Sequence, residues 1–482
     1  IGFSSNEYNK FSTASLITRS TNDVQQVQMT MAMMFRIVLY APIIGIGGVL
    51  RVLETDSSMT WILGVGVVLI LVIIGLLFSI AMPRFTKLQT LIDRLNLVTR
   101  EILTGIPVIR AFSREKHEED RFEDANKVLT KTNLFVNRCM TFMMPSMMLI
   151  MNGISVLIVY NGSYAVDAGN MQVGDMMAFI QYAMQIIMAF LMITAMSIML
   201  PRANVAAMRI VEILETENSL KEPEAPVHPS EEIKGTVEFD HVSFAYPDAG
   251  ENVLTDISFK AEKGQTLAVI GSTGSGKSSL INLIPRFYDV IQGCVKVDGV
   301  DVRSMSQKEL RDRLGYVPQK GVLFSGTIDS NIRYGKTDIS EEQVKKAAMV
   351  AQAQDFIEEK PHGYESPVAQ GGTNVSGGQK QRLSIARAVA KDPEIFIFDD
   401  SFSALDFKTD KALRKALKEH TKNATTIIVA QRISTILNAD QILVLDDGKM
   451  AGLGTHRELM KNCEVYRQIA MSQLSEEELA NE

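Results

Sequence analysis

The chain has 482 residues, of which 46% are hydrophobic and 22% are charged, and its formal net charge is −7. This length exceeds one ordinary domain and the apolar share is high for a soluble protein, so part of the chain is predicted to lie in a membrane. The acidic balance argues against nucleic acid as a partner. The spacing of Cys139, Cys294 and Cys463 fits neither a metal site nor a disulfide framework, and we interpret them as buried apolar residues.

Four apolar stretches in the first half are long enough to cross a bilayer, which takes about 20 helical residues. In chain order they are residues 24–50, 57–83, 139–166 and 176–201, and only the first contains a basic residue, Arg36. If Arg51 marks the outer face, Arg36 lies roughly 22 Å further in and can reach the inner face. The sequence therefore predicts four membrane-spanning helices.

The segments between these stretches predict their orientation. Residues 84–138 carry eleven Lys and Arg, whereas residues 51–58 carry one and residues 167–175 none. Because basic residues stay on the cytoplasmic side, the long segment and both chain ends are expected to be cytoplasmic. Helical periodicity before the segment GIPVIRAFSREK at 105–116 predicts two helices that extend below the bilayer and meet at a short crossing element.

Domain boundaries follow from changes in pattern. Residues 1–214 form the predicted membrane domain, and residues 215–234 are interpreted as a linker because they are rich in proline and glutamate. From 235 to 482, short runs of β-type residues alternate with helical patterns. This alternation predicts an α/β domain with a mostly parallel sheet covered by helices.

A phosphate-binding loop is predicted directly after the apolar strand LAVI. Residues 271–278 read GSTGSGKS and fit the pattern G-x-x-x-x-G-K-[ST] at the start of a helix. Backbone N–H groups of such a loop hold phosphates, its lysine reaches the β and γ oxygens, and its last serine offers a hydroxyl to Mg²⁺. The candidate nucleotide-binding residues are Gly271, Ser272, Thr273, Gly274, Ser275, Gly276, Lys277, Ser278 and Ser279.

The apolar run EIFIFDD ends in two acids. Asp399 closes the run, and an acid at the end of such a strand either caps a helix or holds Mg²⁺ through water. Because the same chain carries the phosphate loop, we expect Asp399 to serve the magnesium ion together with Ser278.

Residues 374–390, NVSGGQKQRLSIARAVA, lie between these two motifs and resemble the signature segment of ABC transporters. The resemblance covers the whole nucleotide domain. Tyr246 in VSFAYP resembles the aromatic residue that stacks on adenine, and Gln319 in YVPQ resembles the glutamine that touches Mg²⁺ and reports to the membrane domain. Residues 403–406, SALD, resemble the loop that crosses to the partner domain. The resemblance implies an ABC-type ATPase domain that binds ATP and Mg²⁺.

The signature segment is suited to serve another domain's nucleotide. Its N–H groups open a helix, whose partial positive charge can face a γ-phosphate. The residues expected to do so are Ser376, Gly377, Gly378 and Gln379. Because the chain's own phosphate loop is too far away in such a fold, the resemblance implies a head-to-tail dimer with two composite sites.

The membrane half is similar to bacterial ABC multidrug exporters in the segments FSTASLITRSTNDV and EILTGIPVIRAFSREK. Such exporters have six spans per half, and the first segment normally follows the second span. We therefore expect an N-terminally incomplete chain with four of six spans.

Two positions depart from the family pattern. Asp400 stands where a glutamate usually polarises the attacking water, and it is shorter by one methylene, a difference of order 1 Å that can cost about 10²-fold in rate. Gln431 stands where a histidine usually faces the γ-phosphate, and an amide cannot carry a proton to the transition state. The two changes predict a site kept for binding, as in one subunit of a heterodimeric exporter.

The spans suggest what is carried. Seventeen of the twenty-six methionines lie within 24–50, 139–166 and 176–201, which suits a polyspecific cavity for amphipathic drugs or lipids, although methionines also pack helices and contact lipid. The expected partners are a second exporter half, with a homodimer left open, membrane lipid and a small amphipathic substrate. A lipid or peptide exporter subunit and an ATP-gated regulatory membrane protein remain alternatives, whereas the four spans set aside a soluble ATPase that acts on DNA.

Overall fold

The computed structural model describes residues 2–55, 59–230, 232–247 and 249–473. The chain divides into two compact units, a helical unit of residues 14–215 and a nucleotide unit of residues 1–13 and 216–482. By its contacts, the described segment 2–13 thus belongs to the nucleotide unit.

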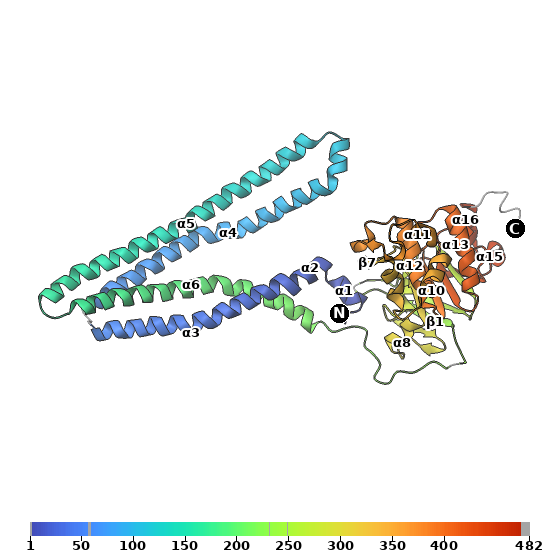
Figure 1. Ribbon diagram of the computed structural model, residues 1–482, viewed down its shortest axis with the longest axis horizontal. Coiled ribbons are helices and arrows are strands. Elements are labelled where there is room, and N and C mark those ends of the chain that lie inside the picture. Colours follow the sequence, from blue (N-terminus) through green and yellow to red (C-terminus); the bar gives the residue numbers. More distant parts are fainter. Residues whose placement is uncertain (1, 56–58, 231, 248, 474–482) are drawn as a thin grey trace. The chain divides into compact units, whose positions relative to one another are not determined.

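The helical unit consists of long helices joined by short connections (Figure 1). The unit begins with a short helix, α2 (Thr13–Thr18), and a π-helical turn, η1 (Arg19–Asp23). The long helices that follow are α3 (Val24–Thr55), α4 (Thr60–Ala111), α5 (Glu115–Asp167) and α6 (Val173–Glu215). Helix α3 packs mainly against α6, and α4 against α5. At the end where α3 leads to α4 and α5 to α6, side chains of all four helices share one apolar core that includes Val52, Ile62, Ile158 and Phe179.

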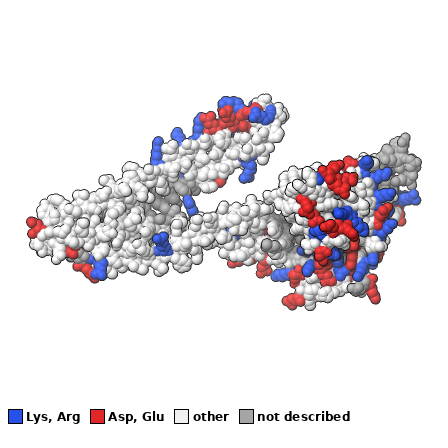
Figure 2. Space-filling model, in the orientation of Figure 1, with Lys and Arg blue, Asp and Glu red and all other residues white. Residues whose placement is uncertain are grey.

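The prediction of four spans is confirmed for the described residues. Segments long and apolar enough to cross a membrane are Thr13–Glu54, Thr60–Ala81, Glu115–Asp167 and Val173–Ile193. Residues 57 and 58 of the predicted second span lie outside the described part of the chain. Figure 2 shows few charged side chains along the helices and a cluster of both signs near the connection of α4 to α5.

Helices α4 and α5 extend well beyond the apolar spans. The last turns of α4 bend towards α5, and residues 112–114 join the two helices (Figure 1). Arg110 Nη1 lies 3.2 Å from Glu115 Oε1 across this connection, and Arg121 of α5 forms an ion pair with Glu101 of α4. A pair of helices that continue beyond the apolar spans is therefore present, as predicted, and the bent end of α4 forms the crossing element.

The nucleotide unit contains two main sheets. A six-stranded sheet has the order β12-β11-β3-β10-β9-β6, and only β12 (Lys449–Gly454) is antiparallel to its neighbour. Its other strands are β3 (Thr266–Gly271), β6 (Leu314–Val317), β9 (Ile395–Asp399), β10 (Thr425–Val429) and β11 (Gln441–Asp446). The predicted mostly parallel sheet is this one.

A second, antiparallel sheet accounts for the other β-type runs. Its order is β2-β1-β4-β5, formed by β1 (Val237–Phe244), β2 (Leu254–Ala261), β4 (Gln292–Val297) and β5 (Val300–Asp301), and a short pair joins β7 (Gly326–Thr327) to β8 (Pro367–Val368). The sequence analysis did not predict this second sheet, in which β1 and β4 pair with each other in antiparallel register.

Helices cover both faces of the parallel sheet. The helices of this unit are α1 (Ser5–Lys10), α7 (Lys277–Leu283), α8 (Gln307–Asp312), α9 (Ile328–Ile332), α10 (Glu341–Val350), α11 (Gln354–Glu358), α12 (Gly377–Lys391), α13 (Phe407–His420), α14 (Ile433–Ile436), α15 (His456–Asn462) and α16 (Glu464–Met471). Helices α10 and α11 pack mainly against other helices of the unit.

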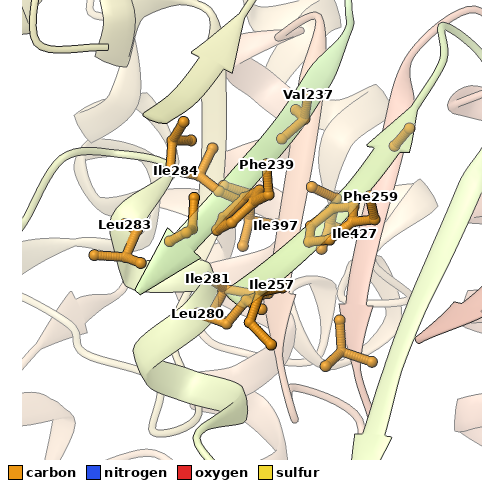
Figure 3. Close-up of a cluster of buried hydrophobic side chains, with 14 of the residues drawn as sticks. Val237, Phe239, Ile257, Phe259, Leu280, Ile281, Leu283, Ile284, Ile397 and Ile427 are labelled. Carbon is orange, nitrogen blue, oxygen red and sulfur yellow. The ribbon is translucent and has the colours of Figure 1, made fainter. Parts of the chain in front are cut away.

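Successive side chains of β9 point to opposite faces of the parallel sheet, so they belong to two separate hydrophobic cores. Ile395 and Ile397 of β9 point to a core shared with α7 and the antiparallel sheet, while Phe396 and Phe398 point to a core with α9–α13. Figure 3 shows the first core, where Phe239, Ile257 and Phe259 of the antiparallel sheet face Ile281, Ile397 and Ile427. This packing holds the ends of β3 and β9, and therefore the phosphate loop, in one place.

The three cysteines are free. Cys463 is buried as expected, whereas Cys139 and Cys294 are half-buried.

Candidate nucleotide-binding site

The phosphate loop follows β3 and leads directly into α7. Gly274 and Gly276 have φ of 87° and 93°, a region that favours glycine. A Cβ on Gly271 would lie 2.2 Å from the carbonyl oxygen of Leu445, so the loop can approach β11 only without a side chain there. The glycines of the predicted motif are thus required by the backbone path.

Lys277 folds back over this loop. Its Nζ donates to the carbonyl oxygens of Gly271 at 2.9 Å and Ser272 at 2.6 Å. Burial lowers the pKa of Lys277, and the carboxylates of Asp400 and Asp399 oppose that effect. The ammonium group is therefore held among the loop and two acids, where it can bind the outer phosphates of a nucleotide.

Ser278 and Asp399 meet although they are far apart in the chain. The Ser278 hydroxyl donates to Asp399 Oδ1 at 3.0 Å, and Asp399 is 6% exposed. Burial raises the pKa of Asp399, while the bond from Ser278 lowers it. Oxygen ligands of this kind suit Mg²⁺, which usually takes one or two protein groups and completes its shell with water and phosphate oxygens. The pair thus fits the predicted ion.

Asp400 turns away from the strand in a left-handed conformation, with φ of 45°. Its Oδ2 accepts two hydrogen bonds from side-chain amides, from Gln431 Nε2 at 2.8 Å and from Gln319 Nε2 at 3.3 Å. The side chain is buried, which raises the pKa of Asp400, while the bond from Gln319 lowers it. The structure therefore brings together both positions that depart from the family pattern.

Tyr246 lies beside the phosphate-loop helix. Its hydroxyl is 2.8 Å from the hydroxyl of Ser279, and its ring makes edge contacts with Phe244 at 4.9 Å and Tyr288 at 5.1 Å between centroids. Tyr246 is thus connected through Ser279 to the helix that follows the phosphate loop.

The signature residues form the first turn of α12. Ser376 caps the helix: its hydroxyl accepts from the N–H of Gln379 at 3.3 Å, and Gln379 Oε1 accepts from the N–H of Ser376 at 3.1 Å. Ser376 and Gly377 are exposed and Gly378 is half-exposed. The side chains of Ser376 and Gln379 bind each other, and this end of the helix is open to an anion.

One connecting residue was missed by sequence reasoning. Gln381 in α12 is 2% exposed, accepts from the N–H of Gly321 at 2.9 Å and donates to the carbonyl oxygen of Pro318 at 3.1 Å. It ties the signature helix to the segment that carries Gln319. A glutamine near the start of a helix with polar neighbours offers no sequence signal for such a role.

Comparison with known proteins covers both halves of the chain. Residues 254–403 match the ABC transporter family, and residues 2–190 match the ABC transporter transmembrane region. An uncharacterized ABC transporter ATP-binding protein of Mycobacterium tuberculosis is 43% identical over 98% of this chain and 81% of its own length. A probable multidrug resistance ABC transporter ATP-binding/permease protein of Bacillus subtilis, YheI, is 33% identical over 96% of this chain and 79% of its own.

The fold is also similar to a solved structure, that of a bacterial Atm1-family ABC exporter with ATP bound. The TM-score is 0.80 with 26% sequence identity, and the match covers 98% of this chain and 83% of the other. Exporters of this family function as dimers. The chain is therefore a multi-pass membrane protein that belongs to the ABC transporter family, and it joins the transmembrane region and the ATP-binding domain of an ATP-driven exporter in one polypeptide.

Proposed function

We propose that this chain is one subunit of a heterodimeric exporter that moves amphipathic compounds, drugs or lipids, out across the cytoplasmic membrane. Its own composite site mainly holds ATP, and its signature turn completes the hydrolytic site of the partner. The nucleotide unit and both chain ends lie in the cytoplasm, as the basic residues of segment 84–138 favour.

The phosphate loop and Lys277 hold the β- and γ-phosphates of ATP, and Tyr246 stacks on the adenine. Ser278, Asp399 and Gln319 would hold Mg²⁺, which neutralises charge on the phosphate oxygens when bound. The 3.0 Å bond between Ser278 and Asp399 supports this assignment, because it places the two oxygen ligands next to each other beside the loop.

The environment of Asp400 carries the proposal of weak hydrolysis. A general base must be free to accept a proton from water. Here one carboxylate oxygen of Asp400 already accepts from two amides, Gln319 and Gln431. Together with the shorter side chain, this arrangement restrains the carboxylate and occupies one of its two oxygens.

Gln431 contributes to the same outcome. Its Nε2 donates to Asp400 at 2.8 Å, and an amide has no proton that it can transfer at neutral pH. The residue therefore orients Asp400, and it cannot supply the charge that a histidine would bring to the γ-phosphate.

The substrate class rests on the apolar spans. Methionines on α3, α5 and α6 present their side chains at the surface of the helical unit, with exposed fractions of 51% for Met29, 65% for Met148 and 63% for Met177. Flexible thioether side chains adapt to apolar molecules of different shape. The Bacillus subtilis relative YheI is described as a probable multidrug resistance transporter, which supports the same substrate class.

The test uses the full-length chain, alone and together with the second half. Alone, the chain should bind Mg-ATP but hydrolyse it far below the usual enzyme range of about 1–10³ per second. Turnover within that range would overturn the proposal of a weak site.

Repair of the site gives a second test. Asp400→Glu together with Gln431→His should raise hydrolysis at this chain's site, and each single variant serves as a control. In the complex, hydrolysis should rise with amphipathic substrate and accompany its transport into vesicles. ATP binding that opens a conductance without such coupled hydrolysis would instead identify an ATP-gated membrane protein.

A further inference from the structure

The nucleotide unit is joined to the helical unit at two places in the chain, after Thr13 at the start of α2 and after Glu215 at the end of α6. Within the nucleotide unit, the residues next to both junctions meet. Asn218 Nδ2 donates to the carbonyl oxygen of Gly2 at 2.7 Å, and the N–H of Ser4 donates to Asn218 Oδ1 at 3.2 Å. The two connecting segments are therefore fastened to each other.

Glu7 is the centre of this junction. It is 7% exposed, and its carboxylate accepts from the N–H of Ser219 at 3.1 Å, from the N–H of Ser4 at 3.0 Å and from the hydroxyl of Ser4. Burial alone would raise the pKa of Glu7, but the bonds from Ser4 and Ser219 outweigh it and hold the pKa below its usual value. A buried, ionised carboxylate with these partners keeps α1 in place.

The N-terminal segment before α2 and the segment after α6 both also contact one turn of the nucleotide unit, residues 286–289, which follows α7. The guanidinium of Arg286 is buried and donates from Nη2 to the carbonyl oxygen of Lys221 at 3.2 Å and to Asp289 Oδ2 at 3.1 Å. From the other segment, Asn9 Nδ2 donates to the hydroxyl of Tyr288 at 3.2 Å. The turn is thus a common docking point for both connections.

The same turn supports the aromatic group beside the phosphate loop. The ring of Tyr288 is 8% exposed and meets the edge of Tyr246 at a centroid distance of 5.1 Å and an interplanar angle of 89°. Phe244 closes the group, at 5.6 Å from Tyr288 and 4.9 Å from Tyr246. Edge contacts of this kind favour one orientation of the central ring.

We propose that Tyr288 is a positioning residue of the nucleotide site: it sets the orientation of Tyr246, and α1 controls it through Asn9. The proposal rests on the adenine role of Tyr246 given above. The contacts form a continuous series, from Asn9 to the Tyr288 hydroxyl, from the Tyr288 ring to Tyr246, and from the Tyr246 hydroxyl to Ser279. Affinity for the base of the nucleotide thereby depends on where α1 lies.

The experiment measures nucleotide binding in the two-chain complex, separately for this chain and for its partner. Photolabelling with 8-azido-ATP, followed by separation of the two chains on a gel, reports occupancy of each site. Competition by ATP is compared with competition by Mg-tripolyphosphate, which lacks the base. The variants are Asn9→Ala and Tyr288→Phe, with Tyr8→Ala as the control on the same helix, where Tyr8 is 49% exposed.

Asn9→Ala and Tyr288→Phe should each raise the ATP concentration for half-competition by about two- to tenfold, the range expected for one hydrogen bond. Competition by tripolyphosphate should not change, and Tyr8→Ala should match the unmodified chain. Equal weakening of ATP and tripolyphosphate would show a merely structural effect and overturn the proposal.

Tyr246→Ala separates this proposal from the proposed function. If it weakens ATP competition while Asn9→Ala and Tyr288→Phe do not, the adenine role stands and the positioning role is wrong. If Tyr246→Ala itself changes nothing, the adenine role is wrong and the positioning role fails with it.

Discussion

The phosphate-loop side and the signature side of the nucleotide unit use their polar groups in opposite ways. Beside the phosphate loop, one carboxylate oxygen of Asp400 accepts hydrogen bonds from the side-chain amides of Gln319 and Gln431. At the start of α12, Ser376 and Gln379 bind each other and leave the glycine N–H groups open. The comparison suggests that the phosphate-loop side can lose hydrolytic activity while the first turn of α12 still contributes its N–H groups to the nucleotide site of the partner.

This separation is possible because different groups hold the fold. The cores on the two faces of the parallel sheet are made of aliphatic and aromatic side chains, and Gln381 links α12 to the segment before Gly321 without using Asp400 or Gln431. Substitutions at Asp400 and Gln431 are therefore expected to alter ATP hydrolysis with little effect on the fold.

The largest effect is expected from Gly378→Leu. A Cβ at this position lies 3.4 Å from the carbonyl oxygen of Ala404 and 3.7 Å from Leu405 Cδ2, distances that the chain itself tolerates. A side chain there would instead block the approach of the partner's γ-phosphate to the N–H groups. ATPase activity and transport by the complex should fall at least about 10²-fold, as for a lost group that stabilises the transition state.

The control for Gly378→Leu is thermal unfolding of the complex without nucleotide, which should be unchanged. Full ATPase activity with an intact fold would show that this signature turn does not serve the hydrolytic site.

A smaller effect on turnover is expected from Lys277→Ala. The variant removes the ammonium group from the chain's own loop, so retention of ATP on this chain should weaken by about 10- to 100-fold, as for a charged hydrogen bond. The partner's site stays assembled, and ATPase activity of the complex should remain measurable. Filter binding and steady-state ATPase assays check the two parts.

Lys277→Ala and Gly378→Leu together test which of the two composite sites is the weak one and which is the hydrolytic one. If Lys277→Ala abolished turnover while Gly378→Leu remained active, the weak and the hydrolytic sites would have been assigned the wrong way round.

The smallest effect concerns stability. Burial raises the pKa of Asp400, so its ionised form destabilises the folded state at pH values above that pKa. Asp400→Asn should raise the unfolding temperature at pH 7 by about 2 °C, and asparagine tolerates the left-handed backbone at this position. The gain should shrink as the pH falls through the raised pKa and vanish below about 3.9, where the carboxyl is protonated in both states.

Asp406→Asn is the matched control with the opposite sign. Asp406 caps α13 and accepts from the N–H of Thr409 at 3.0 Å, which lowers its pKa. Its ionised form therefore stabilises the folded state above the unfolded pKa, and the asparagine variant should not be more stable at pH 7. Calorimetric scans between about pH 3 and pH 8 without nucleotide compare both variants, and equal shifts would contradict the role assigned to burial.

Local patterns were sufficient for part of this protein. The membrane spans follow from uninterrupted apolar runs, and the phosphate loop follows from glycines at fixed spacing, because these features depend on residues close together in the chain. Their presence in α3–α6 and between β3 and α7 is confirmed. The β-type runs were recognised as well, but their pairing was not, since whether β1 joins a parallel or an antiparallel sheet depends on its neighbours and not on its own alternation.

Tertiary structure alone decided the rest. The sequence by itself identified Asp400 and Gln431 as unusual residues, but only the fold places them, 31 positions apart, at 2.8 Å from each other and adds Gln319 from 81 positions away. In the same way, Glu7 reaches Ser219 across 212 positions, and Asn9 reaches Tyr288 across 279. Hydrogen bonds between distant residues leave no periodic trace in a sequence, because packing of the intervening chain brings the partners together.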